Sequence, residues 1–260
     1  MTQTCFYVHD EPAQLFRAAA QRISELATVA IAERGRFLLA LSGGSTPRAL
    51  FDVLALAPFR DGIDWDCVEF FWGDERAVAP DHPDSNFQMA NEALLQPLQI
   101  APERIHRMVG EHADPGTAAR DYARTIATVA GPGSDAPPRL DLILLGLGDD
   151  AHTASLFPGT AALAETESWV VANDVPQLDT TRLTMTFPLI NAAREVLFLA
   201  TGAKKTEAIA AVWNDHGANA DAATTPAGRV RPHDGQLTWF VDRAAAPDQA
   251  SMYLEDEIVE

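Results

Sequence analysis

One histidine of the chain has a carboxylate close to it in a segment rich in glycine. Asp150 and His152 follow an apolar run and the glycines Gly146 and Gly148. A carboxylate two positions before a histidine can orient its imidazole ring, and a neutral imidazole can take a proton from water. The pair therefore predicts a general base. The alternative is a structural or exposed histidine, which is the commoner use of a lone histidine.

The segment from Ser42 to Pro47, with the sequence SGGSTP, has the composition of a phosphate-binding loop. Its glycines, Gly43 and Gly44, let the backbone come close to an anion, and the amides at the start of a following helix point outward. Hydroxyl groups are supplied by Ser42, Ser45 and Thr46. The alternative is an ordinary helix start, with Thr46 as the cap and Pro47 at the first helical position. The segment is not a nucleotide-binding P-loop, because no Gly-Lys-Ser or Gly-Lys-Thr follows.

Charged side chains follow two further apolar runs. Asp74, Glu75 and Arg76 come directly after VEFFW, where charged groups are either solvated or part of a site. The planar guanidinium of Arg76 suits a carboxylate or a phosphate, and an ion pair within the loop is the alternative. Lys204 and Lys205 follow EVLFLA and TG, at the start of a predicted helix. Lysines there oppose the helix dipole, which favours a phosphate ligand over a merely solvated helix start.

Apolar runs and helical periodicity indicate an α/β protein in which these groups meet. Strands are predicted over 37–41, 68–72, 142–145, 169–171, 182–187, 195–200 and 237–241, and helices over 11–34, 48–57, 85–95, 114–130 and 204–213. Repeated strand–loop–helix units predict a largely parallel sheet covered by helices. Ligands of such sheets bind beyond the carboxyl ends of the strands, so SGGSTP, GDER and GDDAHTASLFPG are expected as loops on one rim. The length fits one domain over residues 1–260.

The composition narrows the class of partner. With 37 acidic and 19 basic residues, the formal charge is −18, which repels nucleic acid and anionic lipid surfaces. We therefore expect a small-molecule partner in a local basic pocket, and a monomer or weak homodimer. Cys5 and Cys67 lack the spacing of a zinc site or a disulfide framework, so neither is expected. The N-terminus lacks the features of an export signal, and no run approaches the roughly 20 apolar residues of a membrane helix, so a cytoplasmic protein is predicted.

Five segments, taken in order, resemble the 6-phosphogluconolactonase family. They are LALSGGSTP, FFWGDERAV with HPDSN after it, LGLGDDAHTASLFPG, LATGAKK and PAGRVRPHDGQLTWFVDRAAA, and they span nearly the whole chain. HTASLFPG and GDER are specific in combination, whereas SGGSTP is shared with related sugar-phosphate proteins. The resemblance implies a Rossmann-like, mostly parallel sheet with helices on both faces, similar to the glucosamine-6-phosphate deaminases. It also implies cofactor-free hydrolysis of 6-phosphoglucono-1,5-lactone to 6-phosphogluconate in the pentose phosphate pathway.

The resemblance further implies roles for single residues. The catalytic histidine of the family falls on His152 and the aspartate before it on Asp150. The loop arginine of the family falls on Arg76, which would supply positive charge for the phosphate together with Lys205 and Arg229. Loop amides or Arg76 would meet the developing oxyanion. Substrate-binding groups are expected at Ser42, Gly43, Gly44, Ser45, Thr46, Asp74, Arg76, His152, Lys205 and Arg229, of which residues 42–46 would hold phosphate. The sequence departs from the family pattern at Ala151, where glycine is usual, and at Gly228, where serine is usual. Ala151 would resist a positive φ, so the loop beside His152 is expected to differ slightly.

Two rival functions use the same sugar-phosphate site. A deaminase would carry the motif DGHIAFNEP, with a glutamate five residues after the histidine, but that position is Phe157 here. Asp74 does match the loop aspartate of the deaminases. A sugar-phosphate-sensing module would bind without turnover, since a fold alone does not prove catalysis. The presence of His152 and Asp150 weighs against that module.

A third rival is a dinucleotide-binding enzyme. The glycine pattern that begins at Gly146 could be read as a dinucleotide fingerprint, with Glu165 and Glu167 about 20 residues further on. Such a fingerprint opens a long helix. Phe157, Pro158 and Gly159 would break that helix within about two turns, which weakens this interpretation.

Overall fold

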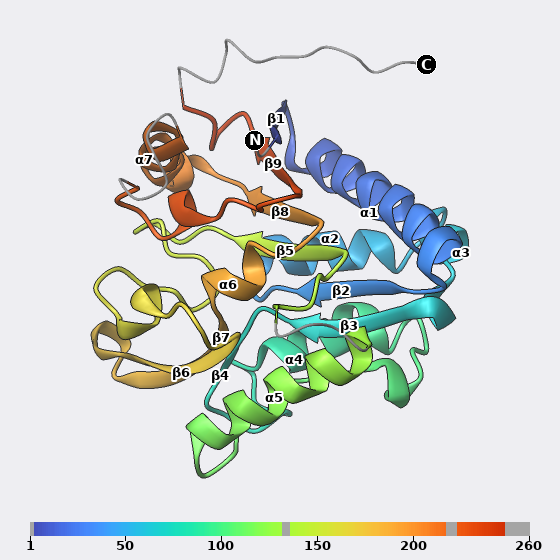
Figure 1. The fold of residues 1–260 in the computed structure, drawn as a ribbon. Helices are drawn as coiled ribbons and strands as arrows, with labels where there is room; N and C mark the ends of the chain where they lie inside the picture. Colours follow the sequence, from blue (N-terminus) through green and yellow to red (C-terminus); the bar gives the residue numbers. More distant parts are fainter. Residues whose placement is uncertain (1–2, 132–135, 217–222, 248–260) are drawn as a thin grey trace.

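The computed structural model describes residues 3–131, 136–216 and 223–247. A six-stranded sheet forms its centre, with the strand order β1-β9-β8-β5-β2-β3, and every neighbouring pair is parallel (Figure 1). Its strands are β1 (Gln3–His9), β2 (Phe37–Leu41), β3 (Val68–Trp72), β5 (Leu142–Gly146), β8 (Glu195–Ala200) and β9 (Gln236–Asp242). The predicted mostly parallel α/β sheet is confirmed.

The central strands are apolar throughout because both faces of the sheet are covered. Every residue of β2 is buried, and successive residues point to opposite faces. Leu38 and Ala40 pack into one core, whereas Leu39 and Leu41 pack into the other. A continuous apolar run is what such a strand requires.

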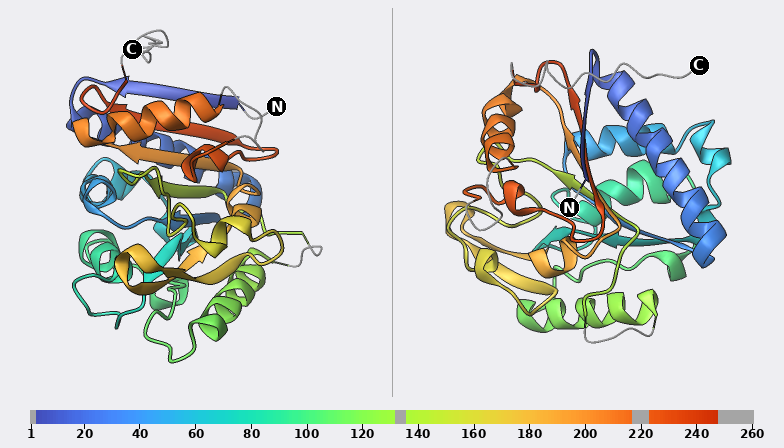
Figure 2. Two further views of the ribbon diagram at one scale, coloured as in Figure 1. Left: turned by 90° about the vertical axis from the view of Figure 1, so that its left-hand side faces the viewer. Right: turned by 45° about the horizontal axis from the view of Figure 1, so that its top comes forward.

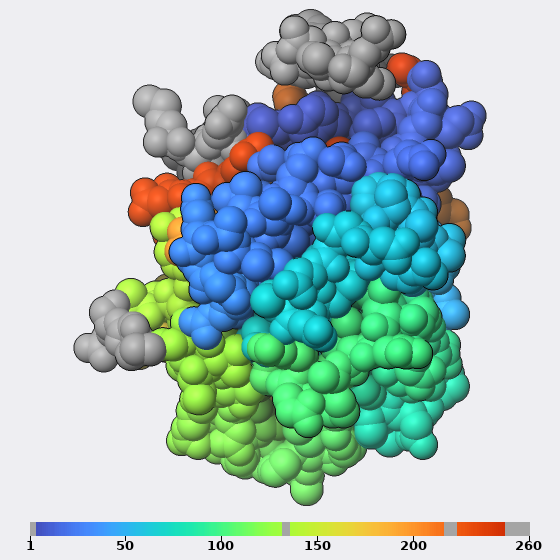
Figure 3. Space-filling view, turned by 90° about the vertical axis from the view of Figure 1, so that its right-hand side faces the viewer, coloured from blue at the N-terminus to red at the C-terminus, as the bar shows by residue number. Residues whose placement is uncertain are grey.

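Helices cover both faces, as predicted. Buried side chains of α1, α2 and α4 contribute to one core, and those of α5 and α7 contribute to the other (Figure 2). Segments from the first half of the chain make up most of the side seen in Figure 3. The helices are α1 (Pro12–Arg34), α2 (Ser45–Leu54), α3 (Phe59–Gly62), α4 (Asn86–Ala90), α5 (Pro115–Ala130), α6 (Phe187–Ile190) and α7 (Thr206–His216).

A second, antiparallel sheet of three strands packs beside the first. Its order is β4-β7-β6, with β4 at Asp74–Arg76, β7 at Thr180–Met185 and β6 at Val170–Val175. The prediction of a loop at GDER is therefore wrong, because its residues pair with β7. Leu183 and Met185 lie in the same core as the central strands. This shared core supports the prediction of one domain over residues 1–260, which stays a prediction.

The strand order of the central sheet changes direction between β2 and β5, which makes this a topological switch point. β3, which follows β2, lies on one side of it, whereas β5 lies on the other side and is followed by β8 further along. The loops after β2 and β5 therefore diverge at their carboxyl ends and leave a crevice there. The loop that begins at Ser42 and the loop that contains His152 border this crevice.

The helix that follows β2 begins earlier than predicted. α2 starts at Ser45 with Gly44 as its N-cap, and no side chain caps it. The prediction that Thr46 caps this helix is wrong. Pro47 is instead the third helical residue, where the missing N–H still removes no intrahelical hydrogen bond. By contrast, a side chain does cap α4, since the hydroxyl of Ser85 accepts a hydrogen bond of 3.2 Å from the backbone amide of Gln88.

Candidate active site

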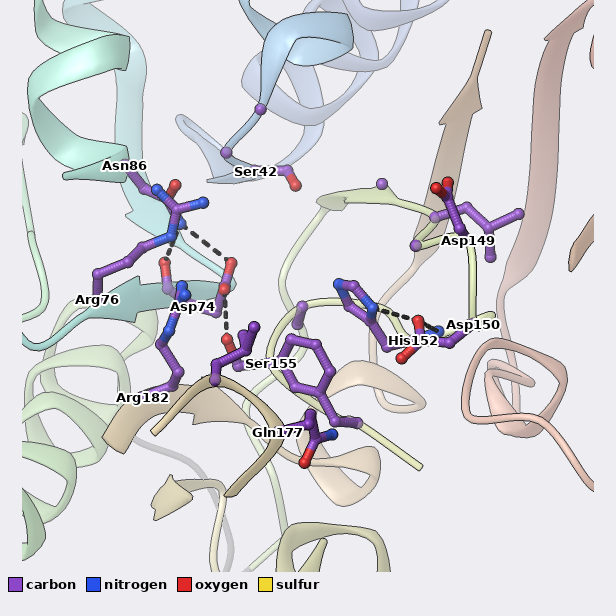
Figure 4. A pocket seen from close by; sticks show the side chains of 18 of the residues that line it. Ser42, Asp74, Arg76, Asn86, Asp149, Asp150, His152, Ser155, Gln177 and Arg182 are labelled. Carbon is purple, nitrogen blue, oxygen red and sulfur yellow. Dashed lines mark hydrogen bonds and ion pairs between the residues drawn. The ribbon is translucent and has the colours of Figure 1, made fainter. Parts of the chain in front are cut away.

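A cavity of about 660 Å³ lies at the carboxyl ends of β2 and β5 and reaches the second sheet (Figure 4). Its walls come from the loop after β2, from β4 and the start of α4, from the loop after β5, from β7 and the turn before it, and from the residue that precedes α7. The lining residues are Ser42, Gly43, Gly44, Asp74, Arg76, Asn86, Gly146, Leu147, Gly148, Asp149, Asp150, His152, Ala154, Ser155, Phe157, Gln177, Leu178, Arg182 and Lys205. Most of the predicted site residues are thus brought together.

His152 and Asp150 form the pair that the sequence predicts. Nδ1 of His152 lies 2.5 Å from Oδ1 of Asp150, and the amide of His152 donates to the same oxygen at 3.2 Å. A neutral ring that donates from Nδ1 keeps a lone pair on Nε2. The ring also stacks on Phe157, with 3.9 Å between the centroids. The histidine is therefore fixed in orientation, with one nitrogen available to accept a proton.

The loop that carries His152 uses a left-handed residue. Ala151 has a φ of 59°, which is the conformation that glycine adopts without strain. Its amide donates to the carbonyl of Gly148 at 3.0 Å, and the amide of Gly148 donates to the carbonyl of His152 at 2.8 Å. Ala151 thus adopts the positive φ that alanine was expected to resist. The expectation that this loop differs slightly from that of the family stays a prediction.

The glycine-rich loop after β2 contributes three of its five predicted residues to the cavity. Ser42, Gly43 and Gly44 line it, whereas Ser45 and Thr46 are not among the lining residues. Thr46 instead pairs its hydroxyl with that of Thr201 at 2.9 Å. A Cβ at Gly43 would lie 1.7 Å from Oδ1 of Asn86, so this position has no room for a side chain.

Lys205 lines the cavity from the short 3-10 helix that directly precedes α7, and it contacts a carboxylate. Its ammonium lies 2.5 Å from Oδ1 of Asp149. The hydrogen bond with Lys205 lowers the pKa of Asp149. Lys204 is exposed and is not a lining residue. Of the two candidate lysines, Lys205 is therefore the one placed to meet a ligand.

The two acidic residues of β4 point to opposite sides of the strand. Asp74 lines the cavity. Its Oδ2 accepts from the hydroxyl of Ser155 at 2.7 Å, and its Oδ1 accepts from the side-chain amide of Asn86 at 3.2 Å. Glu75 is turned away and accepts from the hydroxyl of Ser85 at 3.1 Å. Backbone amides complete its shell, while burial raises its pKa. Asp74 is a site residue, and Glu75 fixes the segment that follows.

Arg76 lines the cavity as predicted, beside an arginine that sequence reasoning did not assign. Its Nη1 donates to the carbonyl of Asp84. Arg182 of β7 lies opposite it in the antiparallel register. Asn86 and Ser155 also line the cavity, and neither was predicted as a site residue. They lie in HPDSN and HTASLFPG, two of the segments that carry the family resemblance. The remaining unassigned residues, Gln177, Leu178 and Arg182, come from β7 and the turn before it, where no motif marks them.

Arg229, like Ser45 and Thr46, is a predicted binding residue that does not line the cavity. Its guanidinium lies 4.5 Å from the ring centroid of Phe187, and Nη1 donates to the carbonyl of Leu163 at 2.8 Å. It is absent from the cavity lining. The neighbouring Gly228 is needed for space, because a Cβ there would lie 2.6 Å from Cβ of Asp215. Both residues therefore pack against parts of the chain that do not line the cavity.

Two further features concern metal binding and membrane insertion. Within the described ranges, no group of three or more His, Cys, Asp or Glu side chains is arranged to hold a metal ion. No helix in that part of the chain has the length and apolar character needed to cross a membrane.

Comparison with known proteins agrees with this site. Residues 10–239 match the family described as glucosamine-6-phosphate isomerases/6-phosphogluconolactonase. A 6-phosphogluconolactonase of a Nostoc species is 39% identical over 248 residues, covering 95% of this chain and 99% of the relative. The solved 6-phosphogluconolactonase from Trypanosoma cruzi superimposes with a TM-score of 0.81 at 31% identity, covering 94% of this chain and 97% of that one.

A more distant structure shares the fold alone. A monomeric glucosamine-6-phosphate deaminase superimposes with a TM-score of 0.76 at 21% identity, covering 94% of this chain and 98% of that one. The expected similarity to the deaminase fold is thereby confirmed. The match of the family over residues 10–239 decides the assignment, and the chain belongs to the glucosamine-6-phosphate isomerase/6-phosphogluconolactonase family.

Proposed function

We propose that the protein is a 6-phosphogluconolactonase, which hydrolyses 6-phospho-D-glucono-1,5-lactone to 6-phosphogluconate with His152 as the general base. The observation that carries this proposal is the contact of 2.5 Å between His152 Nδ1 and Asp150 Oδ1 at the wall of the cavity. It holds the ring while Nε2 remains free to accept a proton. The family and the names of the relatives supply the substrate class.

In the proposed reaction His152 acts first as a base and then as an acid. Nε2 takes a proton from water while the water oxygen bonds to C1, which makes C1 tetrahedral and its carbonyl oxygen anionic. Collapse breaks the bond between C1 and the ring oxygen, and His152 returns the proton to that oxygen. The product acid then loses a proton to solvent. Asp150 stabilises the imidazolium that forms between the two steps.

The phosphate of the substrate is assigned to the side of the cavity that carries Ser42 to Gly44 and Lys205. Backbone amides at the start of α2 suit a phosphate, because they are not used within the helix. Lys205 adds a positive charge, and its ammonium would contact both the phosphate and Asp149. Binding at this remote group would hold the lactone in one orientation toward the general base.

The position of Phe157 favours hydrolysis over deamination. Its ring stacks on His152 at 3.9 Å between centroids and occupies the sequence position where a deaminase carries a glutamate. A carboxylate for proton transfer is therefore missing at that position.

We place the reaction in the oxidative branch of the pentose phosphate pathway. A cytoplasmic location and a monomer or weak homodimer stay predictions from the sequence.

Proton release after addition of freshly prepared lactone tests this function directly. Spontaneous hydrolysis is measured without protein and subtracted. Fast release with the wild-type protein supports the lactonase. If the sugar phosphate binds without release above background, the chain is a binding module; if glucosamine 6-phosphate yields ammonia instead, it is a deaminase.

A further inference from the structure

Arg76 and Arg182 lie directly opposite each other on paired strands. β4 and β7 are antiparallel with Arg76 in register with Arg182, and both residues line the cavity. Opposite residues in such a pair have their Cβ atoms about 5 Å apart, and like charges there destabilise a sheet. Two guanidinium groups kept together at a cavity wall carry a cost that an anionic ligand would relieve.

The protein itself leaves donors of both arginines unused. Nε of Arg76 and Nε of Arg182 are buried and have no hydrogen-bond partner among the residues that the structure describes. The nearby carboxylates are occupied by neutral donors: Asp74 accepts from Ser155 and Asn86, and Glu75 accepts from Ser85 and backbone amides. Burial, followed by repulsion from Arg76, lowers the pKa of Arg182. The pair thus offers two adjacent positive groups with unused donors, which is the chemistry that binds an anion.

The arginine pair and Lys205 lie at different sides of the cavity. In Figure 4, Arg76 and Arg182 lie on one side, Asp149 lies on the other, and the ring of His152 is drawn between them. Lys205 belongs to the side of Asp149, with which it forms an ion pair of 2.5 Å. A ligand whose phosphate meets Lys205 therefore extends past His152 toward the two arginines.

We propose that Arg182, together with Arg76, binds the oxygen at C1 that becomes anionic when water attacks the lactone and that ends in the carboxylate of the product. This inference rests on the proposed function. The lactone carries one anionic group, its phosphate, and hydrolysis creates the second at C1. Two planar guanidinium groups match the oxygens of a carboxylate. Because this charge appears only as the reaction proceeds, binding it lowers the barrier instead of merely holding the substrate.

The test compares ligands with and without an exocyclic oxygen at C1. 6-Phosphogluconate is open-chain and carries both the phosphate and the carboxylate, whereas 1,5-anhydroglucitol 6-phosphate keeps the phosphate and the ring but has no exocyclic oxygen at C1. Binding of each is measured by calorimetry for the wild type, Arg182→Gln, Arg182→Lys and Arg124→Gln. Arg124 lies exposed on α5 and serves as the matched control for loss of one arginine.

We expect Arg182→Gln to weaken binding of 6-phosphogluconate by roughly 10-fold to 100-fold, as for loss of a hydrogen bond to a charged group. Binding of 1,5-anhydroglucitol 6-phosphate should stay within about twofold of the wild type, as should both ligands for Arg124→Gln. The turnover rate should fall by roughly 100-fold, the usual cost of one oxyanion donor. Arg182→Lys should recover part of the affinity, because it keeps the charge but loses the planar fork.

Three results would overturn the inference. Equal weakening of both ligands would assign Arg182 to the phosphate or to the fold, and unchanged affinity for both would remove it from the site. Failure of the wild type to bind 6-phosphogluconate would also exclude it. Thermal unfolding checks each variant, and if Arg182→Gln does not fold, the same comparison is made with Arg182→Lys. The proposed function fails separately, if the wild type binds both ligands but does not hydrolyse the lactone.

Discussion

The ammonium of Lys205 lies 2.5 Å from Oδ1 of Asp149, so the lysine assigned to the phosphate already has a carboxylate partner. Asp149 is largely exposed, and an exposed ion pair contributes about 0.2–1 kcal/mol. A phosphate must share Lys205 with this carboxylate or displace it. The strength of substrate binding is therefore expected to depend on both residues.

Asp149→Asn should lower KM by roughly twofold to fivefold, because a phosphate then no longer competes with a carboxylate for Lys205. Lys205→Met should raise KM by roughly 10-fold or more, as expected for loss of a charged hydrogen bond. Steady-state kinetics with the lactone measures both. An increase in KM for Asp149→Asn would show that Asp149 orients Lys205 instead of competing with the ligand.

Asp150→Asn should lower the turnover rate by roughly 100-fold or more, since the amide no longer accepts the Nδ1 proton or stabilises the imidazolium. KM should change little, because the side chain of Asp150 contacts His152 and not the groups assigned to the phosphate. The same exchange at Asp121, an exposed residue of α5, is the matched control and should leave turnover unchanged. Equal turnover for Asp150→Asn and the wild type would remove Asp150 from the mechanism.

Gly43→Ala should weaken binding of substrate and destabilise the fold. The added Cβ would lie 1.7 Å from Oδ1 of Asn86, so the buried side chain of Asn86 would have to move and give up its hydrogen bonds to Asp74. We expect a loss of about 1–3 kcal/mol in the free energy of unfolding, as for other overpacked sites. Gly62→Ala is the control, since no atom lies within 4 Å of its added Cβ. Denaturant unfolding compares the two, and similar stability for both variants would contradict the close approach.

Ala151→Gly should raise the free energy of unfolding by up to about 1 kcal/mol. The φ of 59° at Ala151 strains an alanine but not a glycine, and the gain exceeds the added entropy of the unfolded glycine. Ala32→Gly, at an exposed helical position of α1, should instead destabilise by about 1 kcal/mol. Thermal and denaturant unfolding measure the opposite signs. Destabilisation of both variants to the same extent would show that the loop holds Ala151 without strain.

The parts of the fold that sequence reasoning predicted are those with strong local patterns. The apolar run in β5 and the helical period of α1 identify buried elements, and the rim of a parallel sheet then gathers SGGSTP and GDDAHTASLFPG. β1 was missed, although it pairs with β9 along seven residues. Its segment, with the sequence QTCFYVH, mixes polar and apolar residues because it lies at the edge of the sheet.

The second sheet shows where local patterns fail. Asp74 to Arg76 form a strand only because β7, more than 100 residues later in the chain, pairs with them. No short segment contains that information. The same pairing brings Arg182 to Arg76, so the arginine pair was beyond sequence reasoning. Arg229 differs in the opposite way, since the family resemblance assigns it to the substrate but its side chain packs on Phe187 and does not line the cavity.

The most direct test of the central claim compares proton release by the wild type and by His152→Ala after addition of fresh 6-phosphoglucono-1,5-lactone. His152→Ala should lower the enzymatic rate by roughly 100-fold or more while binding of 6-phosphogluconate persists, as expected for loss of the general base. Turnover by His152→Ala at nearly the wild-type rate would contradict the account.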